Sequence, residues 1–408
     1  MAAKNIPHNP SPPSVTAGTA AFPKDTRAAL TVVLLTVGAY GLMMGMAPPL
    51  IAVALDGRGH SGTLVGLNAA MPAFGQFLAS GFIVYGARRF GIRRLLAVCL
   101  AADALLLASL AVLDGLVAWF VIRLATGATL NSVLILSETW INVAAPPAAR
   151  GRVLGIYNGI MAAAMAVGPA ILALLGTEGA LPFLVAASFA LFAMVPTLVI
   201  DTDVPRLEGH AAASPWIVVK VLPVASFAAL MFAWRELGGM ALLPLHGMRA
   251  GLSESSAMLT LTVAGIGGIA LQYPIGWLAD RLGARRTLAI CILAAFASSA
   301  LLAHAPAMMP FYLAVLFVWG GAFAGLYTIV LVMIGQTFSG SHLVAANAGI
   351  GIVWGVGHLT GPSLLGVAMD GLGRFGLPIV FSSGLAFLGL MLALSALNSG
   401  TPNHRRDS

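Results

Sequence analysis

The chain has 408 residues, of which 59% are apolar and 9% are charged, and its mean hydropathy is +0.95. Soluble globular domains carry about 25% charged residues, so this chain has too few charges to cover a water-facing surface. The net charge of +7 does not indicate a nucleic-acid partner, because the Lys and Arg residues lie in short segments between apolar runs and form no single patch.

The chain begins with a Pro-, Ser- and Ala-rich segment, 1–27, which has no apolar core and predicts a disordered tail, not a signal peptide. Apolar runs of the length that crosses a bilayer then predict spans at 28–54, 63–85, 95–113, 116–138, 153–175 and 180–200. After a linker at 201–220, six more are predicted at 221–247, 255–278, 287–308, 310–335, 343–366 and 376–397. A polar tail, 398–408, follows. The predicted fold is all-α, with twelve transmembrane helices in two six-helix bundles, 28–200 and 221–397.

The positions of the positive charges predict the orientation. Of 21 Lys and Arg residues, sixteen fall in the segments that share a side with the N-terminus. Two more, Arg123 and Arg235, lie inside spans. The remaining three lie in the opposite loops and are Arg58, Arg249 and Arg374. Cytoplasmic loops carry an excess of Lys and Arg. We therefore expect a multi-pass protein of the bacterial inner membrane with both termini in the cytoplasm.

Two landmarks repeat between the halves. Residues 89–99 read RFGIRRLLAVC and residues 281–291 read RLGARRTLAIC, a shift of 192 positions. The Gly168-Pro169 pair recurs as Gly361-Pro362, a shift of 193. A duplicated six-helix unit is typical of transporters whose halves rock about a site at the bilayer midplane.

The junction after the eighth predicted span carries a charged motif, Gly276-x-x-x-Asp280-Arg281-x-Gly283-x-Arg285-Arg286. It resembles the major facilitator superfamily signature G-x-x-x-D-R-x-G-x-R-R, which implies a twelve-helix transporter and a latch on the cytoplasmic side. The first-half copy departs from the signature, with Arg88 at the aspartate position and Val84 at the first glycine. The resemblance therefore implies that the latch depends on the second half.

Further stretches are similar to elements of the same superfamily. Arg123 and Gly127 match an R-x-x-x-G element that implies an arginine beside a protonatable carboxylate. Residues 357–366 read G-x-x-x-G-P-x-x-x-G, which is similar to a motif of exporters. The alternative for both glycine patterns is close helix packing. Residues 137–142 and 242–245 look like a YcaD-like bacterial branch, which implies no known substrate.

Among the charged residues, four stand out because they lie well inside predicted spans, namely Asp103, Arg123, Arg235 and Glu236. Such residues cost about 2.5–3.5 kcal/mol each on insertion scales, so they are candidates for function. We regard all four as proton-coupling candidates, with Glu236 first, because the resembled fold lines its cavity with spans one, four, seven and ten. The alternative is a buried ion pair that fixes helix packing, such as Asp103 with Arg123.

Aromatic and amide side chains at cavity depth are candidates for substrate contact, although most such residues serve packing. The candidates are Tyr40, Gln76, Asn131, Trp234, Tyr327, Trp354 and His358. His358 could equally be a packing residue. Glu138 and Asn142, at the cytoplasmic end of the fourth span, are interpreted as interfacial anchors.

The sequence does not favour an enzyme. It has no phosphate-binding glycine loop with its lysine, no H-E-x-x-H pair and no nucleophile elbow. Its two cysteines, Cys99 and Cys291, form no metal-ligand spacing, and no cofactor or metal is expected. We expect a monomeric secondary transporter of a small organic molecule, with proton-coupled export (antiport) preferred. The alternatives are an uptake symporter or uniporter and, from another class, a non-transporting membrane receptor or scaffold.

Overall fold

A computed structural model describes residues 24–146, 149–199, 214, 216–304 and 308–399, and these contain helices but no strand. The first half comprises α1 (Lys24–Gly57), α2 (Gly62–Phe90), α3 (Ile92–Ser109), α4 (Leu116–Ala144), α5 (Arg150–Leu175) and α6 (Leu181–Val199). The all-α prediction is confirmed.

The helices of the second half are more often interrupted. They are α7 (Ile217–Val221), α8 (Pro223–Ala233), the π-helix η1 (Trp234–Gly239), α9 (Met240–Arg249), α10 (Glu254–Ala270), α11 (Gln272–Leu282), α12 (Ala284–Leu301), α13 (Met309–Thr337), α14 (Gly340–Leu372), the short 3₁₀ helix η3 (Gly373–Phe375) and α15 (Gly376–Ser399). The run α8–η1–α9 corresponds to the seventh predicted span, and α10–α11 to the eighth. A π-helical turn inside an α-helix often marks a functional position, and this one contains Glu236.

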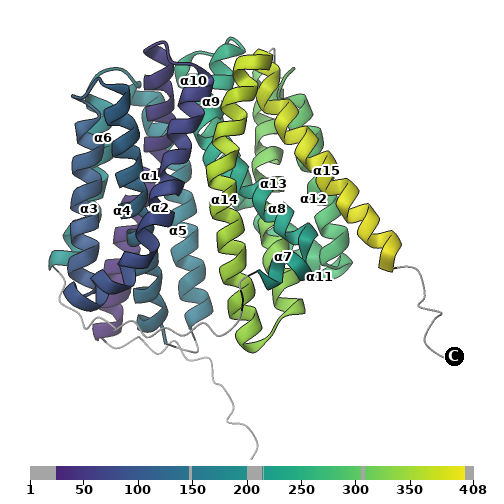
Figure 1. Ribbon diagram of the computed structural model, residues 1–408, viewed down its shortest axis with the longest axis horizontal. Coiled ribbons are helices and arrows are strands. Elements are labelled where there is room, and N and C mark those ends of the chain that lie inside the picture. The colour runs from purple at the N-terminus through teal and green to yellow at the C-terminus, as the bar shows by residue number, and fades with distance from the viewer. Residues whose placement is uncertain (1–23, 147–148, 200–213, 215, 305–307, 400–408) are drawn as a thin grey trace, which may run out of the picture.

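The two halves stand side by side, with α1–α6 on the left of Figure 1 and α7–α15 on the right. They meet where α2 packs on α14 and α5 packs on α10. α1 starts at the lower edge of the view, α15 descends towards the lower right, and the α1–α2 connection lies at the upper edge (Figure 1). We call these the lower and upper ends of the molecule.

Eight helical stretches in the described part of the chain are long and apolar enough to cross a membrane. One of them, Gly340–Leu397, combines α14 and α15, and another, Glu254–Leu282, combines α10 and α11. α3 has the length but carries Arg93, Arg94 and Asp103. The number of twelve crossings therefore stays a prediction.

Several helices extend beyond the predicted spans. α1 begins at Lys24, so residues 24–27, predicted as tail, are helical, and α4 continues to Ala144. Apolar runs mark the part of a helix that lies in hydrocarbon, and the helix continues into the polar interface. Most of the predicted tails and linker lies outside the described residues, at 1–23, 200–213, 215 and 400–408.

The internal duplication reappears in the helix contacts. A Cβ atom at Gly75 would overlap the carbonyl oxygen of Leu124, so α2 and α4 touch through their backbones. A Cβ atom at Gly267 would likewise overlap the carbonyl oxygen of Phe317, so α10 and α13 approach each other as closely as α2 and α4 do. The members of these two pairs are 192 and 193 positions apart. Small residues permit such contacts between membrane helices, and the repeated pair shows that both halves pack in the same way.

Candidate functional site

A cavity with a volume of about 380 Å³ lies between the two halves. Helices α1, α2, α4 and α5 supply one wall, and η1, α9, α13 and α14 supply the other. On α4 the lining residues Arg123, Thr126, Leu130, Leu134 and Glu138 recur at the three- to four-residue spacing of one helix face. The cavity therefore extends for about 20 Å along α4, at roughly 1.5 Å per residue.

The two walls are related by the duplication but differ in chemistry. Shifting by 193 positions converts Met43, Met161 and Met165 into Glu236, Trp354 and His358, and all six residues line the cavity. The first half thus presents methionines where the second half presents a carboxylate, an indole and an imidazole. At these three pairs of positions the polar and ionisable side chains belong to the second half, whereas the first half contributes Arg123 and Glu138 from α4.

Glu236 is held by α14. Trp354 Nε1 donates a hydrogen bond of 2.7 Å to Glu236 Oε2, and His358 Nε2 lies 3.3 Å from the same oxygen. Trp354 and His358 are four residues apart on α14, so both reach the carboxylate from one helix face. Among the described residues Glu236 Oε1 has no hydrogen-bond partner, and the side chain is 25% exposed. The carboxylate is thus oriented through one oxygen, and the other remains available.

Arg123 lines the cavity from α4, and only 3% of the residue is exposed. Its Nε atom is buried without a hydrogen-bond partner, and no ion pair to its guanidinium occurs among the described residues. The buried Asp103–Arg123 pair considered from the sequence does not form. Asp103 instead accepts hydrogen bonds from Tyr40, at 3.2 Å, and from Thr129.

Asp103 and Tyr40 are therefore buried inside the first half and do not line the cavity. Their hydrogen bonds connect α3 to α1 and α4. Arg235 faces a smaller cavity of about 150 Å³ beside α5, where its guanidinium carbon lies 5.2 Å from the centre of the Trp319 ring. Glu236 lines both cavities. No ion pair joins the side chains of Arg235 and Glu236, both of which are described.

The other candidates from the sequence divide in two. Gln76, Tyr327, Trp354 and His358 line the main cavity, whereas Asn131 and Trp234 do not. Trp234 Nε1 donates to Thr360 Oγ1 at 3.0 Å. Sequence reasoning missed the methionines of the wall and assigned Glu138 to the interface, although it lines the cavity. The four-residue spacing of Tyr157, Met161 and Met165 could have indicated one helix face.

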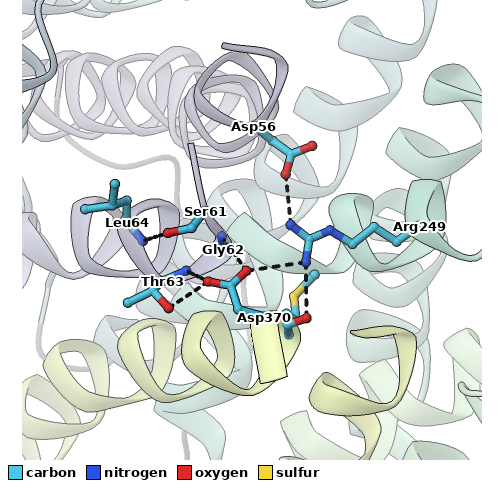
Figure 2. A network of polar contacts seen from close by, with 8 residues as sticks. Asp56, Ser61, Gly62, Thr63, Leu64, Arg249 and Asp370 are labelled. Carbon is cyan, nitrogen blue, oxygen red and sulfur yellow. Dashed lines mark hydrogen bonds and ion pairs between the residues drawn. The ribbon is translucent and has the colours of Figure 1, made fainter. Parts of the chain in front are cut away.

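Polar contacts join the two halves at the upper end of the molecule (Figure 2). Asp370, near the end of α14, accepts hydrogen bonds from the backbone N–H groups of Gly62 and Thr63 at 2.8 and 2.7 Å, and from Thr63 Oγ1 at 2.7 Å. These are unpaired N–H groups in the first turn of α2, where a carboxylate is favourable. Arg249 pairs with Asp56 at 3.0 Å and lies 3.8 Å from Asp370.

A second contact of the same kind joins α10 to the first half. Glu254 accepts hydrogen bonds from the backbone N–H and the hydroxyl of Thr177 at 2.8 and 2.7 Å, and Ser255 donates to the carbonyl of Ala173 at 2.9 Å. Within the described chain, every hydrogen bond or ion pair that we find between the halves lies at this upper end. The conformation is thus closed above the cavity.

Comparison with known proteins decides the family. A model of the Major Facilitator Superfamily matches residues 31–253 and 225–408. The chain belongs to the major facilitator superfamily. It is therefore a membrane transporter by family.

Relatives and solved structures agree with this assignment. YfkF of Bacillus subtilis strain 168, described as an uncharacterized MFS-type transporter, is 25% identical over 355 residues, which cover 81% of this chain and 86% of YfkF. YcaD of Escherichia coli O7:K1, described in the same way, is 24% identical over 321 residues, covering 78% and 81%. The resemblance to a YcaD-like branch is confirmed.

Two solved structures share the fold. A mutant of the nucleoside transporter NupG superposes with a TM-score of 0.74 at 16% identity, covering 90% of this chain and 99% of NupG. A bacterial homologue of the human lysosomal transporter Spinster, in an inward-facing and unoccupied conformation, gives 0.68 at 14% identity, covering 92% and 96%. At these identities the likeness establishes the fold alone.

The superfamily signature lies at the lower end, where α11 meets α12. Gly283 has a φ of +83°, which allows the sharp turn between the two helices. Arg285 donates to Leu392 O and to Ser395 Oγ on α15, and Arg281 lies over the Trp277 ring, so both contacts stay within the second half. Asp280 is exposed and forms no hydrogen bond or ion pair with the described residues. The proposed latch is thus not engaged in this conformation. Gly276 and Arg286 complete the motif.

We expect the substitution Asp280→Asn to favour the conformation described here, because a latch carboxylate can stabilise only the state in which the lower end closes. Cysteines replacing Asn142 on α4 and Gln336 on α13, both exposed at the lower end, should react faster with a polar maleimide in this variant. Asp280→Glu retains the charge and serves as the control. Equal reaction rates in all three proteins, with unchanged transport, would show that Asp280 has no gating role.

Proposed function

We propose that the protein is a proton-coupled antiporter, which exports a small organic molecule by alternating access of the cavity to the two sides of the membrane. The observation that carries this proposal is the position of Glu236. It lies in the cavity wall between the halves, on a π-helical turn, with one carboxylate oxygen held by Trp354 and His358 and the other available.

Glu236 can bind and release a proton without losing its position, because Trp354 donates to the carboxylate oxygen in either protonation state. His358, at 3.3 Å, can share or relay that proton. When the halves rock, Glu236 would be exposed first to one side and then to the other. In the proposed antiport, the cavity would carry the substrate in one half-cycle and the proton on Glu236 in the other.

The lower end is proposed to face the cytoplasm of a bacterial cell. Arg88, Arg89, Arg150, Arg152 and Arg286 lie at helix junctions of this end, as the positive-inside rule requires of a cytoplasmic face. The cavity reaches toward the same end through the exposed Glu138. The described conformation would thus load substrate from the cytoplasm, and Arg123, seven residues from the start of α4, would lie at the closed end of the cavity.

Export is preferred because of the exporter-like motif at 357–366. In the structure Gly361 and Gly366 of this motif approach backbone atoms of Trp234 and Gly62 so closely that a Cβ atom would overlap them. The motif therefore packs α14 against η1 and against α2, between the proton site and the upper closure. An uptake symporter or uniporter uses the same cavity, so direction requires an experiment.

Comparison of a deletion strain with its parent tests both substrate and direction. Intracellular and extracellular metabolites should be measured in the two strains under conditions in which the gene is expressed. Export predicts at least one compound that accumulates inside the deletion strain and is depleted from its medium. The opposite pattern would indicate uptake, and identical profiles in an expressing strain would favour a receptor or scaffold.

A further inference from the structure

Arg123 presents a positive charge that no carboxylate in the described part of the chain neutralises. Each of the carboxylates that could pair with it has another arrangement. Asp103 is bound to Tyr40 and Thr129, and Glu236 is bound to Trp354 and His358. Glu138 lies fifteen residues further along α4, which places it about 22 Å away at 1.5 Å per residue.

The burial of Arg123 makes this isolation costly. A guanidinium is always charged and has five N–H donors, and a buried charge requires a counter-charge or hydrogen bonds. With 3% of the residue exposed and Nε unpaired, Arg123 has neither from the described chain, and it lines the cavity. Buried unpaired ionisable groups in membrane proteins mark substrate pathways. The missing partner is therefore expected to enter through the cavity.

The surroundings of Arg123 limit what this partner can be. Beyond Arg123 a large part of the cavity wall is apolar and includes Leu130, Met43, Met161, Met165 and Met240. Methionine side chains are flexible and polarizable, so they adapt to apolar groups of different shape. A volume of about 380 Å³ is near the lower limit for small-molecule sites.

We infer that the cavity binds a small amphipathic organic anion, whose carboxylate or phosphoryl oxygens bind the Arg123 guanidinium at the closed end while its apolar body lies against the methionine wall. A planar guanidinium suits both anions, because its parallel N–H groups can donate to two oxygens at once. This inference rests on the proposed function, since it takes the cavity as the substrate site. The anion site at Arg123 is then distinct from the proton site at Glu236.

Binding at equilibrium tests the inference without any gradient. The full-length protein in nanodiscs would be heated with benzoate, 3-phenylpropionate, 4-phenylbutyrate or phenylphosphonate, and with the amides of the three carboxylic acids. The acids match their amides in size and differ in charge. At least one acid should raise the unfolding midpoint with a saturable concentration dependence, and its amide should not. Stabilisation by the phosphonate alone would identify the anion as phosphoryl.

Variants show whether Arg123 is responsible. Arg123→Gln should weaken binding of the stabilising acid at least about tenfold, which corresponds to about 1.4 kcal/mol, and Arg123→Lys should retain a preference for the acid over the amide. Arg374→Gln removes an exposed arginine of η3, outside the cavity, and should bind like the wild type. The inference is overturned if neither a carboxylic acid nor the phosphonate stabilises the wild type, if acids and amides act equally, or if Arg123→Gln binds the stabilising anion as well as the wild type does. Because the binding experiment uses no gradient, anion binding at Arg123 can be confirmed even if transport proves not to be coupled to protons.

Discussion

Glu236→Gln is expected to reduce pH-driven accumulation of substrate in proteoliposomes to the level of protein-free vesicles, while exchange of labelled for unlabelled substrate continues. Glutamine keeps the length of the side chain and an oxygen that can accept from Trp354, so the cavity wall is preserved. It cannot bind or release a proton, so the gradient no longer drives transport. The assay compares substrate counterflow with uptake after a pH step.

The matched control is Glu178→Gln, which neutralises an exposed carboxylate at the upper end and should leave both activities unchanged. Loss of exchange as well as accumulation would mean that Glu236 serves substrate binding. If Glu236→Gln still concentrates substrate after a pH step, this residue does not carry the proton, and Asp103 becomes the next candidate.

Asp370→Asn is expected to open the upper end. The carboxylate accepts three hydrogen bonds from Gly62 and Thr63 and lies near Arg249. Asparagine has one acceptor oxygen, and its NH₂ group would face an N–H donor. Hydrogen bonds to a charged group contribute about 1.5–3 kcal/mol each. Asp370 is partly exposed, so we take the loss at the low end of that range, which shifts the balance between closed and open conformations about tenfold.

Spin labels at Glu178 in the first half and Leu372 in the second half, both exposed at the upper end, would report this shift as a longer inter-label distance. Asp114→Asn is the matched control, because Asp114 is also an upper-end carboxylate but pairs at 3.0 Å with Arg58 of its own half. Its distance distribution should match the wild type. An unchanged distribution in Asp370→Asn would show that these contacts do not hold the upper end closed.

The fold could be predicted because its causes can be read from the sequence without knowing where each side chain points. Apolar length, loop charge and a repeat at 192–193 positions together indicate two similar helical bundles, and the superfamily signature at 276–286 is contiguous. The π-helical turn at Trp234–Gly239 could not be predicted in this way. Its extra residue per turn leaves no compositional signal, although it determines where Glu236 points.

The site was only partly predictable, because side-chain direction in an apolar helix leaves a weak signal. Helices buried on most sides lack a clear polar face, so Trp354 and His358 could be recognised by chemistry, but Tyr40 and Trp234 could not be excluded. The methionine wall was missed for the same reason. Asp103 was a candidate because a carboxylate inside a membrane helix is costly. In the structure, hydrogen bonds from Tyr40 and Thr129 of the same half offset the cost of burying it.

The most direct test of the account uses the wild-type protein in proteoliposomes, with a pH gradient imposed in either direction and the substrate identified from the deletion strain. Protons flow from the acidic to the alkaline compartment, and in antiport the substrate moves against them. We predict that substrate accumulates in the acidic compartment and that reversing the gradient reverses the accumulation. Accumulation in the alkaline compartment, or transport that is indifferent to the gradient, would contradict proton-coupled antiport.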